Sequence, residues 1–261
     1  MRGVKRAVAA LLLVVVAGCG PATSAAPTPA IATASPSDTP TPHPQAAVAV
    51  PVESSTPLPT SSPSPVATIR LKLDANWTSA DRSADGFAIG LPPRWRDIDV
   101  DPQLIDESLQ SITDPQYQAL LRQQTASLSG TGVKLFAFDF TPSNVSSTGF
   151  TTNFNVVSET LPYAVSLDTY EQLTLGQLGQ LDAVSKPIAH QRVTLPAGAC
   201  SKLSYNISFT TGTTRTTSSI TQYLLINGLT AYVITFTTTT QQLATYAPMF
   251  TKIATTFTLA K

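Results

Sequence analysis

The sequence predicts an α+β domain over residues 67–261, built on a mainly antiparallel sheet with helices packed against it. Short segments alternate between apolar and polar residues, which is the period of a half-buried strand. Other segments carry apolar residues at helical spacing. An Asn227-Gly228 pair between two apolar runs adds a hairpin. The order of strand, helices, two strands, helix, meander and helix indicates this fold class.

In the first half of the domain, alternation and aromatic content predict the strands. They are expected at 69–73, 87–91, 97–101, 134–140 and 154–159. Asp101-Pro102 and Asp114-Pro115 each place a helix-capping acid before a first-turn proline, so two short helices are predicted after them. The strand at 134–140 has three phenylalanines on one face, which predicts that this face is buried.

In the second half, Asp168 and Glu171 have the spacing of a capping box, which predicts the start of an amphipathic helix. A strand at 199–209 is expected to precede the hairpin at 223–236, whose Asn227-Gly228 pair predicts a type I′ turn. A closing helix follows, because apolar residues recur at helical spacing. They are Leu243, Tyr246, Phe250 and Ile253. Pro248 is expected to break or kink this helix unless it opens a second turn.

The first nineteen residues predict export. Arg2, Lys5 and Arg6 precede an apolar stretch that is too short to span a bilayer as a helix. Val16-Ala17-Gly18-Cys19 then resembles the bacterial lipoprotein signal. This resemblance implies that residues 1–18 are a signal peptide and that Cys19 becomes an acylated N-terminus. The domain would then be anchored to a bacterial membrane on its extracytoplasmic side. An ordinary cleaved signal or a short membrane anchor remains the alternative.

Residues 19–66, which begin with that cysteine, are predicted to form a disordered linker. The segment from Gly20 to Val66 holds twelve of the 21 prolines and no aromatic residue, and its charged residues are Asp38 and Glu53. It cannot bury enough apolar surface to offset the entropy of ordering the chain. Proline, serine and threonine instead favour an extended, semi-rigid tether.

Charge and composition exclude several classes of function. The chain has 16 basic and 16 acidic residues, so nothing in its charge favours a nucleic-acid partner. Two cysteines and two histidines supply neither a disulfide framework nor a histidine-rich metal site. No phosphate-binding glycine loop or serine-hydrolase elbow is present. The sequence therefore predicts no cofactor, no metal and no catalytic residue.

Three acids, Asp97, Asp99 and Asp101, superficially begin a calcium loop. An EF-hand requires glycine at the sixth position and glutamate at the twelfth, where this chain has Pro102 and Ser108. The acids therefore indicate the water-facing side of an amphipathic strand.

His190 and Cys200 are the reactive side chains of the predicted domain. His190 is expected on a surface or edge strand without a catalytic role. Cys200 is expected as a small buried strand residue. Trp95 and Tyr232 are interpreted as core anchors and not as platforms for a ligand.

Several fixed points resemble the PsbP-like superfamily, which includes the photosystem oxygen-evolving subunit, the Ran-binding Mog protein and many bacterial lipoproteins. The motifs are Gly86-Phe87-Ala88-Ile89 with Pro93 and Trp95, Gly198-Ala199 with Tyr205, the Asn227-Gly228 hairpin, residues 231–235, and Phe250, Ile253 and Thr256-Phe257. The resemblance spans most of 85–258 and departs from the pattern at 141–153. It implies an α/β/α sandwich and a function in binding, and it transfers no catalytic residue and no metal ligand.

The sequence thus predicts a membrane-anchored, extracytoplasmic binding or accessory module that is not an enzyme. Its expected partners are the membrane, through acyl chains on Cys19, and a protein or a small hydrophobic ligand. Two alternatives stay open. One is an extracytoplasmic hydrolase whose site is assembled from scattered polar residues, and the other is a structural envelope lipoprotein.

Overall fold

A computed structural model describes residues 69–98, 115, 118, 122, 132–141, 150–211 and 214–260. The expected signal peptide and linker lie outside the described residues, as does most of the segment in which two short helices are predicted. In that segment Pro115, Gln118 and Arg122 are described, and all three are helical.

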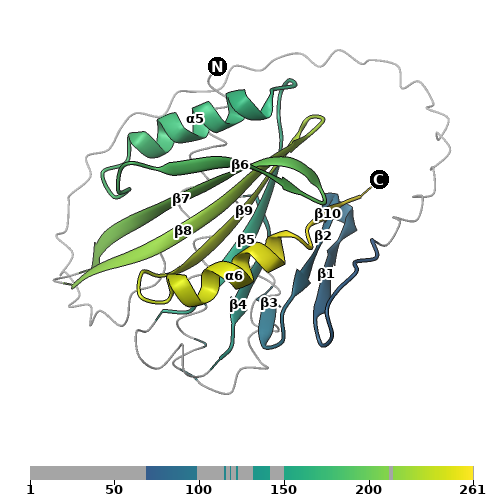
Figure 1. Cartoon of the computed structure of the whole chain (residues 1–261), viewed down its shortest axis with the longest axis horizontal. Coiled ribbons are helices and arrows are strands. Elements are labelled where there is room, and N and C mark those ends of the chain that lie inside the picture. The colour runs from purple at the N-terminus through teal and green to yellow at the C-terminus, as the bar shows by residue number, and fades with distance from the viewer. Residues whose placement is uncertain are drawn as a thin grey trace, which may run out of the picture. The chain divides into compact units, whose positions relative to one another are not determined.

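The large sheet has seven strands in the order β3-β4-β5-β9-β8-β7-β6, and every neighbouring pair is antiparallel (Figure 1). Its strands are β3 (Trp95–Ile98), β4 (Val133–Asp139), β5 (Asn153–Thr160), β6 (Ala189–Leu195), β7 (Gly198–Thr211), β8 (Thr214–Asn227) and β9 (Thr230–Thr239). The predicted antiparallel sheet is confirmed.

A smaller antiparallel sheet has the order β1-β2-β10, formed by Thr78–Arg82, Phe87–Leu91 and Thr258–Leu259. The short 3-10 helix η2 (Ser83–Asp85) joins β1 to β2 and ends at Gly86, whose φ is +86°. A Cβ atom at Gly86 would lie 2.5 Å from the Tyr232 hydroxyl, so both the backbone angle and the close approach require glycine there.

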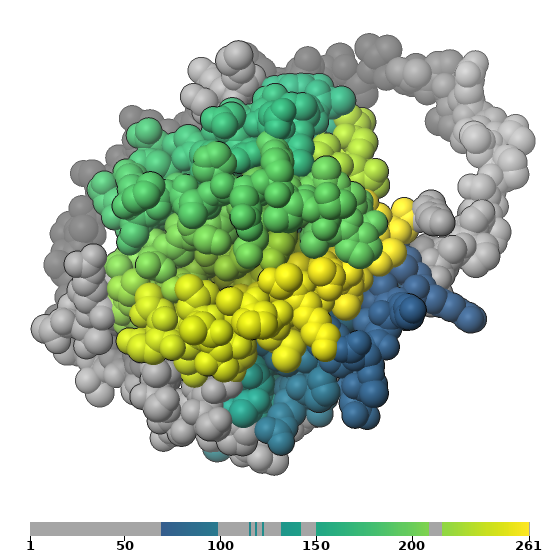
Figure 2. Space-filling view, viewed as in Figure 1, coloured from purple at the N-terminus to yellow at the C-terminus, as the bar shows by residue number. Residues whose placement is uncertain are grey.

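Helix α5 (Leu167–Gly179) covers one face of the large sheet, where Tyr170 and Leu178 are buried. Helix α6 (Leu243–Ala254) covers the opposite face together with the small sheet, and Figure 2 shows the two side by side. Alternation along β4 divides its side chains between these two cores: Phe136 and Phe138 pack with α5, and Leu135 packs with α6. The predicted sandwich of helices around a sheet is confirmed.

The strand predicted at 69–73 is absent, although its alternation is real. Ile69, Leu71 and Leu73 are half-buried while Arg70 and Lys72 are exposed, but among the described residues the segment pairs with no strand. Alternation of apolar and polar residues predicts an extended segment with one buried side. It does not predict whether another strand lies beside that segment to pair with it.

The capping residue predicted for α5 was wrong. Ser166 is the N-cap, and its hydroxyl accepts from the Thr169 amide at 3.1 Å. Asp168 and Glu171 lie inside the helix, where both interact with side chains of β6. The two residues of a capping box are three positions apart, and so are two residues on the same face of a helix. Spacing alone therefore did not distinguish a capping box from two side chains that face a neighbouring strand.

The hairpin is present, but its turn is displaced by one residue from the prediction. Asn227 pairs with Thr230, so the central residues are Gly228 and Leu229. Gly228 has a φ of +60°, and neither Asn227 nor Leu229 has a positive φ. This is the pattern of a type II′ turn, which places glycine first.

Pro248 does not break α6, which runs without interruption from Leu243 to Ala254. Proline removes one hydrogen bond to the carbonyl four residues earlier, that of Ala244. Both Ala244 and Pro248 lie on the exposed side of the helix, where water can solvate the freed carbonyl.

Candidate functional site

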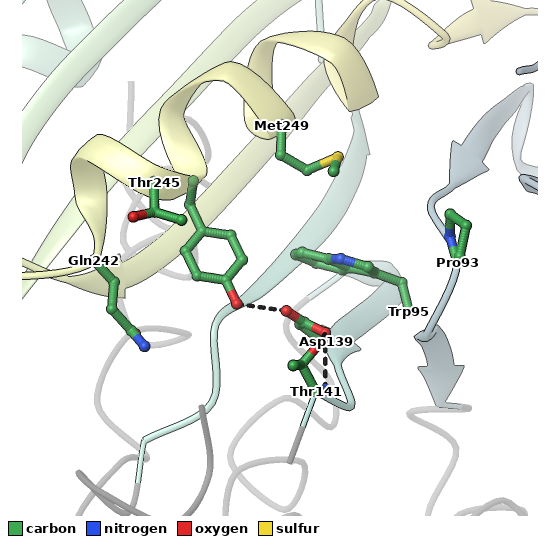
Figure 3. A pocket seen from close by; sticks show the side chains of 8 residues that line it. Pro93, Trp95, Asp139, Thr141, Gln242, Thr245 and Met249 are labelled. Atoms are coloured by element: carbon green, nitrogen blue, oxygen red, sulfur yellow. Dashed lines mark hydrogen bonds between the residues drawn. The ribbon is translucent and has the colours of Figure 1, made fainter. Parts of the chain in front are cut away.

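A cavity of about 420 Å³ opens between α6 and the adjoining ends of β3 and β4 (Figure 3). Three apolar and five polar residues line it. They are Pro93, Trp95 and Met249, and Asp139, Thr141, Gln242, Thr245 and Tyr246.

The local backbone explains why these residues meet. Trp95 begins β3 and pairs directly with Asp139, the last residue of β4. A turn with Arg94 at a φ of +72° precedes Trp95, and the Arg94 carbonyl accepts from the Phe140 amide at 3.0 Å. The turn therefore fixes Trp95 against the end of β4, and α6 closes the third side with Tyr246.

Asp139 is a carboxylate at the base of the cavity with only 6% of its surface exposed. Its Oδ1 atom accepts from the amide of Thr141 at 2.9 Å and from the Thr141 hydroxyl at 2.6 Å. The Tyr246 hydroxyl donates to Oδ2. Charge-assisted hydrogen bonds of this kind stabilise a carboxylate that is almost removed from water.

Trp95 is the packed part of the apolar side of the cavity. It is 3% exposed and lies with its ring centroid 5.5 Å from that of Phe154, so it is a core anchor, as the sequence predicted. The other lining residues are more accessible: Pro93 and Thr245 are exposed, and Thr141, Gln242 and Met249 are half-buried. The cavity thus has an apolar side and polar groups that hydrogen bonds fix at its base.

His190 lies on the edge strand β6, as predicted, and is 51% exposed at its side chain. Its Nδ1 atom is 2.8 Å from Oε1 of Glu171, a carboxylate that is 5% exposed. Arg192 bonds the other Glu171 oxygen and also Asp168. These residues join α5 to β6, and none of them is among the residues lining the cavity.

Cys200 is fully buried in β7, as predicted. Burial raises the pKa of its thiol to about 11, and the opposing effect of Arg192 is smaller. Because the thiolate is the reactive form, this cysteine is protected both by its proton and by its lack of contact with solvent.

We expect Cys200 to stay unmodified when the folded Cys19→Ala variant, in which Cys200 is the remaining cysteine, is treated with a thiol reagent at pH 8. About one thiol in a thousand would be ionised at a pH three units below its pKa. Unfolding with guanidinium removes the burial and should make the thiol react completely. Mass spectrometry before and after denaturation measures this, and rapid labelling of the native protein would contradict it.

The structure does not support a calcium site at the three acids Asp97, Asp99 and Asp101. Asp97 forms an ion pair with Arg82 at 2.8 Å, and Asp99 and Asp101 lie outside the described residues. Within the part of the chain that the structure describes, no group of three acidic, histidine or cysteine side chains could hold a metal ion.

The sequence did not reveal the cavity. Helical spacing places Tyr246 on the closing helix, and Asp139 lies within the predicted strand at 134–140 without further signal. They are 107 residues apart, so only the fold brings them into contact. Likewise the Glu171–His190 pair was missed, because Glu171 was assigned to a helix cap.

No family model matches the chain, and a search of curated proteins finds no match. Several solved structures have a similar fold. Cyanobacterial PsbP (CyanoP) from Synechocystis sp. PCC 6803 is 14% identical, with a TM-score of 0.42 over 77% of this chain and 99% of that one. LpqN of Mycobacterium tuberculosis, described as involved in cell envelope biogenesis, is 11% identical, with a TM-score of 0.43 over 71% and 92%.

The Ran-binding protein Mog1p of Saccharomyces cerevisiae is 12% identical, with a TM-score of 0.40 over 71% of this chain and 96% of that one. A PsbP and a Mog protein are thus among the solved structures to which the chain is similar. The class that the fold defines is an antiparallel α+β sandwich with a cavity beside α6.

None of the helices formed by described residues is long and apolar enough to cross a membrane.

Proposed function

We propose that this chain is a lipid-anchored extracytoplasmic protein whose folded domain is a non-catalytic binding or accessory module. The observation that carries the proposal is the cavity beside Asp139, in which an apolar side lies next to polar groups fixed by hydrogen bonds. A small ligand with an apolar part would contact Met249 and Pro93 at this site.

The anchoring part of the proposal rests on the leader. Cys19 follows a basic start, an apolar core and two small residues, in the register of a lipoprotein signal. Each buried methylene group contributes about 0.8 kcal/mol, so two or more acyl chains anchor a protein stably. The proline-rich segment at 20–66 would then act as a tether between the acylated cysteine and the folded domain.

A hydrolase is the second candidate, and the contact between His190 and Glu171 favours it. This candidate is weaker because the pair joins α5 to the edge strand β6 and neither residue lines the cavity. Turnover across a panel of ester, amide and glycoside substrates, lost in His190→Ala, would establish the hydrolase. The binding proposal expects no such turnover.

We expect Cys19→Ala to abolish membrane association in a bacterial host that processes lipoproteins. The variant lacks the sulfur that carries the acyl chains, so it should move from the detergent phase to the aqueous phase in a detergent-partitioning experiment. Ser24→Ala, a substitution of similar size in the linker, is the matched control and should partition like the original chain. Retention of Cys19→Ala in the detergent phase would disprove anchoring through this cysteine.

A further inference from the structure

Two exposed apolar side chains lie together at one end of the large sheet. Among the described residues, the exposed large hydrophobic side chains are Tyr163 at 54%, Leu229 at 49% and Leu173 at 38%. Tyr163 lies in the connection from β5 to α5, and Leu229 is in the turn between β8 and β9. The amide of Leu161 donates to the carbonyl of Leu229 at 2.6 Å, so this connection and this turn are adjacent (Figure 1).

The two loops form a small surface, named here the apolar tip, that consists of Pro162, Tyr163, Ala164 and Leu229. All four residues are exposed. Neither the connection at 161–166 nor the turn at 228–229 contains a charged residue. A single exposed apolar residue is ordinary on a protein surface, whereas adjoining ones are typical of a site that contacts another apolar surface.

The fold does not require the side chains of the tip. A type II′ turn needs glycine at its first central position, which Gly228 supplies, and polar residues suit the second position, where this chain has Leu229. The connection is held at its ends by other residues, because Leu161 is buried and Ser166 caps α5. The tip is therefore a fixed backbone that presents apolar groups to the outside.

The chemistry of the tip suits a lipid surface. Tyrosine has an apolar ring and a polar hydroxyl, so it is enriched where membrane hydrocarbon meets water. The nearest acids along the chain interact within the domain: Glu159 accepts from the Tyr170 hydroxyl at 3.1 Å, and Asp168 pairs with Arg192. The tip itself brings no charge that would have to lose its water at a bilayer.

The size of the tip favours a membrane over a protein partner. A specific protein interface uses about 20–30 residues on each side, whereas the tip has four. A weak contact with lipid is sufficient when another part of the chain already holds the domain at the bilayer, because tethering raises the effective concentration. The proposed tether at 20–66 would reach roughly 140 Å at full extension, so it would allow this end of the domain to meet the membrane.

We propose that the apolar tip inserts into the surface of the membrane to which the chain is anchored, with Tyr163 at the level of the lipid headgroups. This rests on the proposed function, since the acyl anchor brings the domain to the bilayer. The tip and the cavity lie at opposite ends of β5: Thr160 pairs with Thr230 beside the turn, and at the other end the Thr152 carbonyl accepts from the Asp139 amide at 2.9 Å. Insertion would therefore hold the cavity on the side away from the bilayer.

The test uses the acylated full chain in vesicles of phosphatidylcholine, with tryptophan as the reporter. Tyr163→Trp keeps an aromatic residue that prefers the membrane interface, and Leu173→Trp places the same reporter on α5 outside the tip. Bromine atoms on the lipid chains quench a tryptophan that enters the bilayer. The emission that Tyr163→Trp adds to that of the unsubstituted chain is expected to shift to shorter wavelength and to be quenched, and the emission that Leu173→Trp adds is expected to do neither.

Two serine substitutions in the Tyr163→Trp chain locate the contact. Leu229→Ser removes apolar area from the tip and is expected to lower the ratio of inserted to free tips by about fivefold. Leu173→Ser is the matched control, because it removes an exposed leucine outside the tip, and it should change this ratio by less than about twofold. Quenching that requires anionic phosphatidylglycerol and low salt would overturn insertion through apolar groups.

Flotation of the same vesicles reports the anchor separately. A chain that floats while the Tyr163→Trp emission stays unquenched would overturn the tip and leave the anchor in place. A chain that does not float would overturn the anchor and the tip together. A shift to shorter wavelength in membranes of the host cell that vesicles of its extracted lipids do not reproduce would assign the tip to a protein partner and overturn the lipid.

Discussion

Replacing Phe236 by alanine is expected to lower the free energy of unfolding by about 3–5 kcal/mol, the largest effect that we predict for a single side chain. Phe236 is fully buried in β9, and its ring centroid lies 5.3 Å from that of Phe154 and 4.8 Å from that of Phe250. It therefore joins the centre of the large sheet to α6, and alanine would leave a cavity at that junction.

Urea denaturation followed by circular dichroism measures this loss. Leu229→Ala is the control, because Leu229 lies in the hairpin turn with 49% of its surface exposed and should change the stability by less than about 0.5 kcal/mol. A loss below about 1 kcal/mol for Phe236→Ala would mean that this aromatic cluster does not hold α6 on the sheet.

The second large effect is expected at the base of the cavity, where Asp139→Ala should cost about 3 kcal/mol. This substitution removes the acceptor that the Tyr246 hydroxyl and the Thr141 amide share, and both Asp139 and Tyr246 are buried. Tyr246→Phe removes one donor and keeps the ring, so it should cost less, about 1–2 kcal/mol.

Urea denaturation of both single variants and of the double variant completes a thermodynamic cycle. We expect a coupling energy of about 1 kcal/mol or more between Asp139 and Tyr246, since each loses a partner when the other is replaced. Additive losses would show that the hydrogen bond between them contributes nothing to stability.

Asp139 fixes the N-terminal half of α6 to the end of β4 through its hydrogen bond with Tyr246, and both residues line the cavity. The two experiments therefore measure how much this contact contributes to the stability of the domain.

Local patterns in the sequence were sufficient to predict most strands, the helices α5 and α6 and the buried aromatic face of β4. The alternation at 87–91, the strand expected at 154–159 and the helical spacing of Tyr246, Phe250 and Ile253 all correspond to observed elements. Each signal depends on residues within one or two turns or along one strand, where backbone periodicity alone decides which side chains share a face.

Details that depend on a neighbouring element were predicted less well. The extended segment at 69–73 pairs with no strand in the part of the chain that the structure describes. Glu171 faces His190 and Arg192 instead of capping its own helix. The hairpin turn lies one residue further along the chain than predicted. The reason is that pairing and burial along the whole strand, as well as the turn residues, fix the register of a strand.

By itself, the sequence determined the fold class, the positions of most elements and the prediction of an acylated Cys19, because these depend on composition and on short-range periodicity. Only the tertiary structure decided where the cavity lies. Trp95, Asp139 and Tyr246 come from three separate elements, and strand pairing and the packing of α6 bring them together. Residues that are distant in the chain form the cavity by packing together. Patterns within a short stretch of sequence do not predict such contacts.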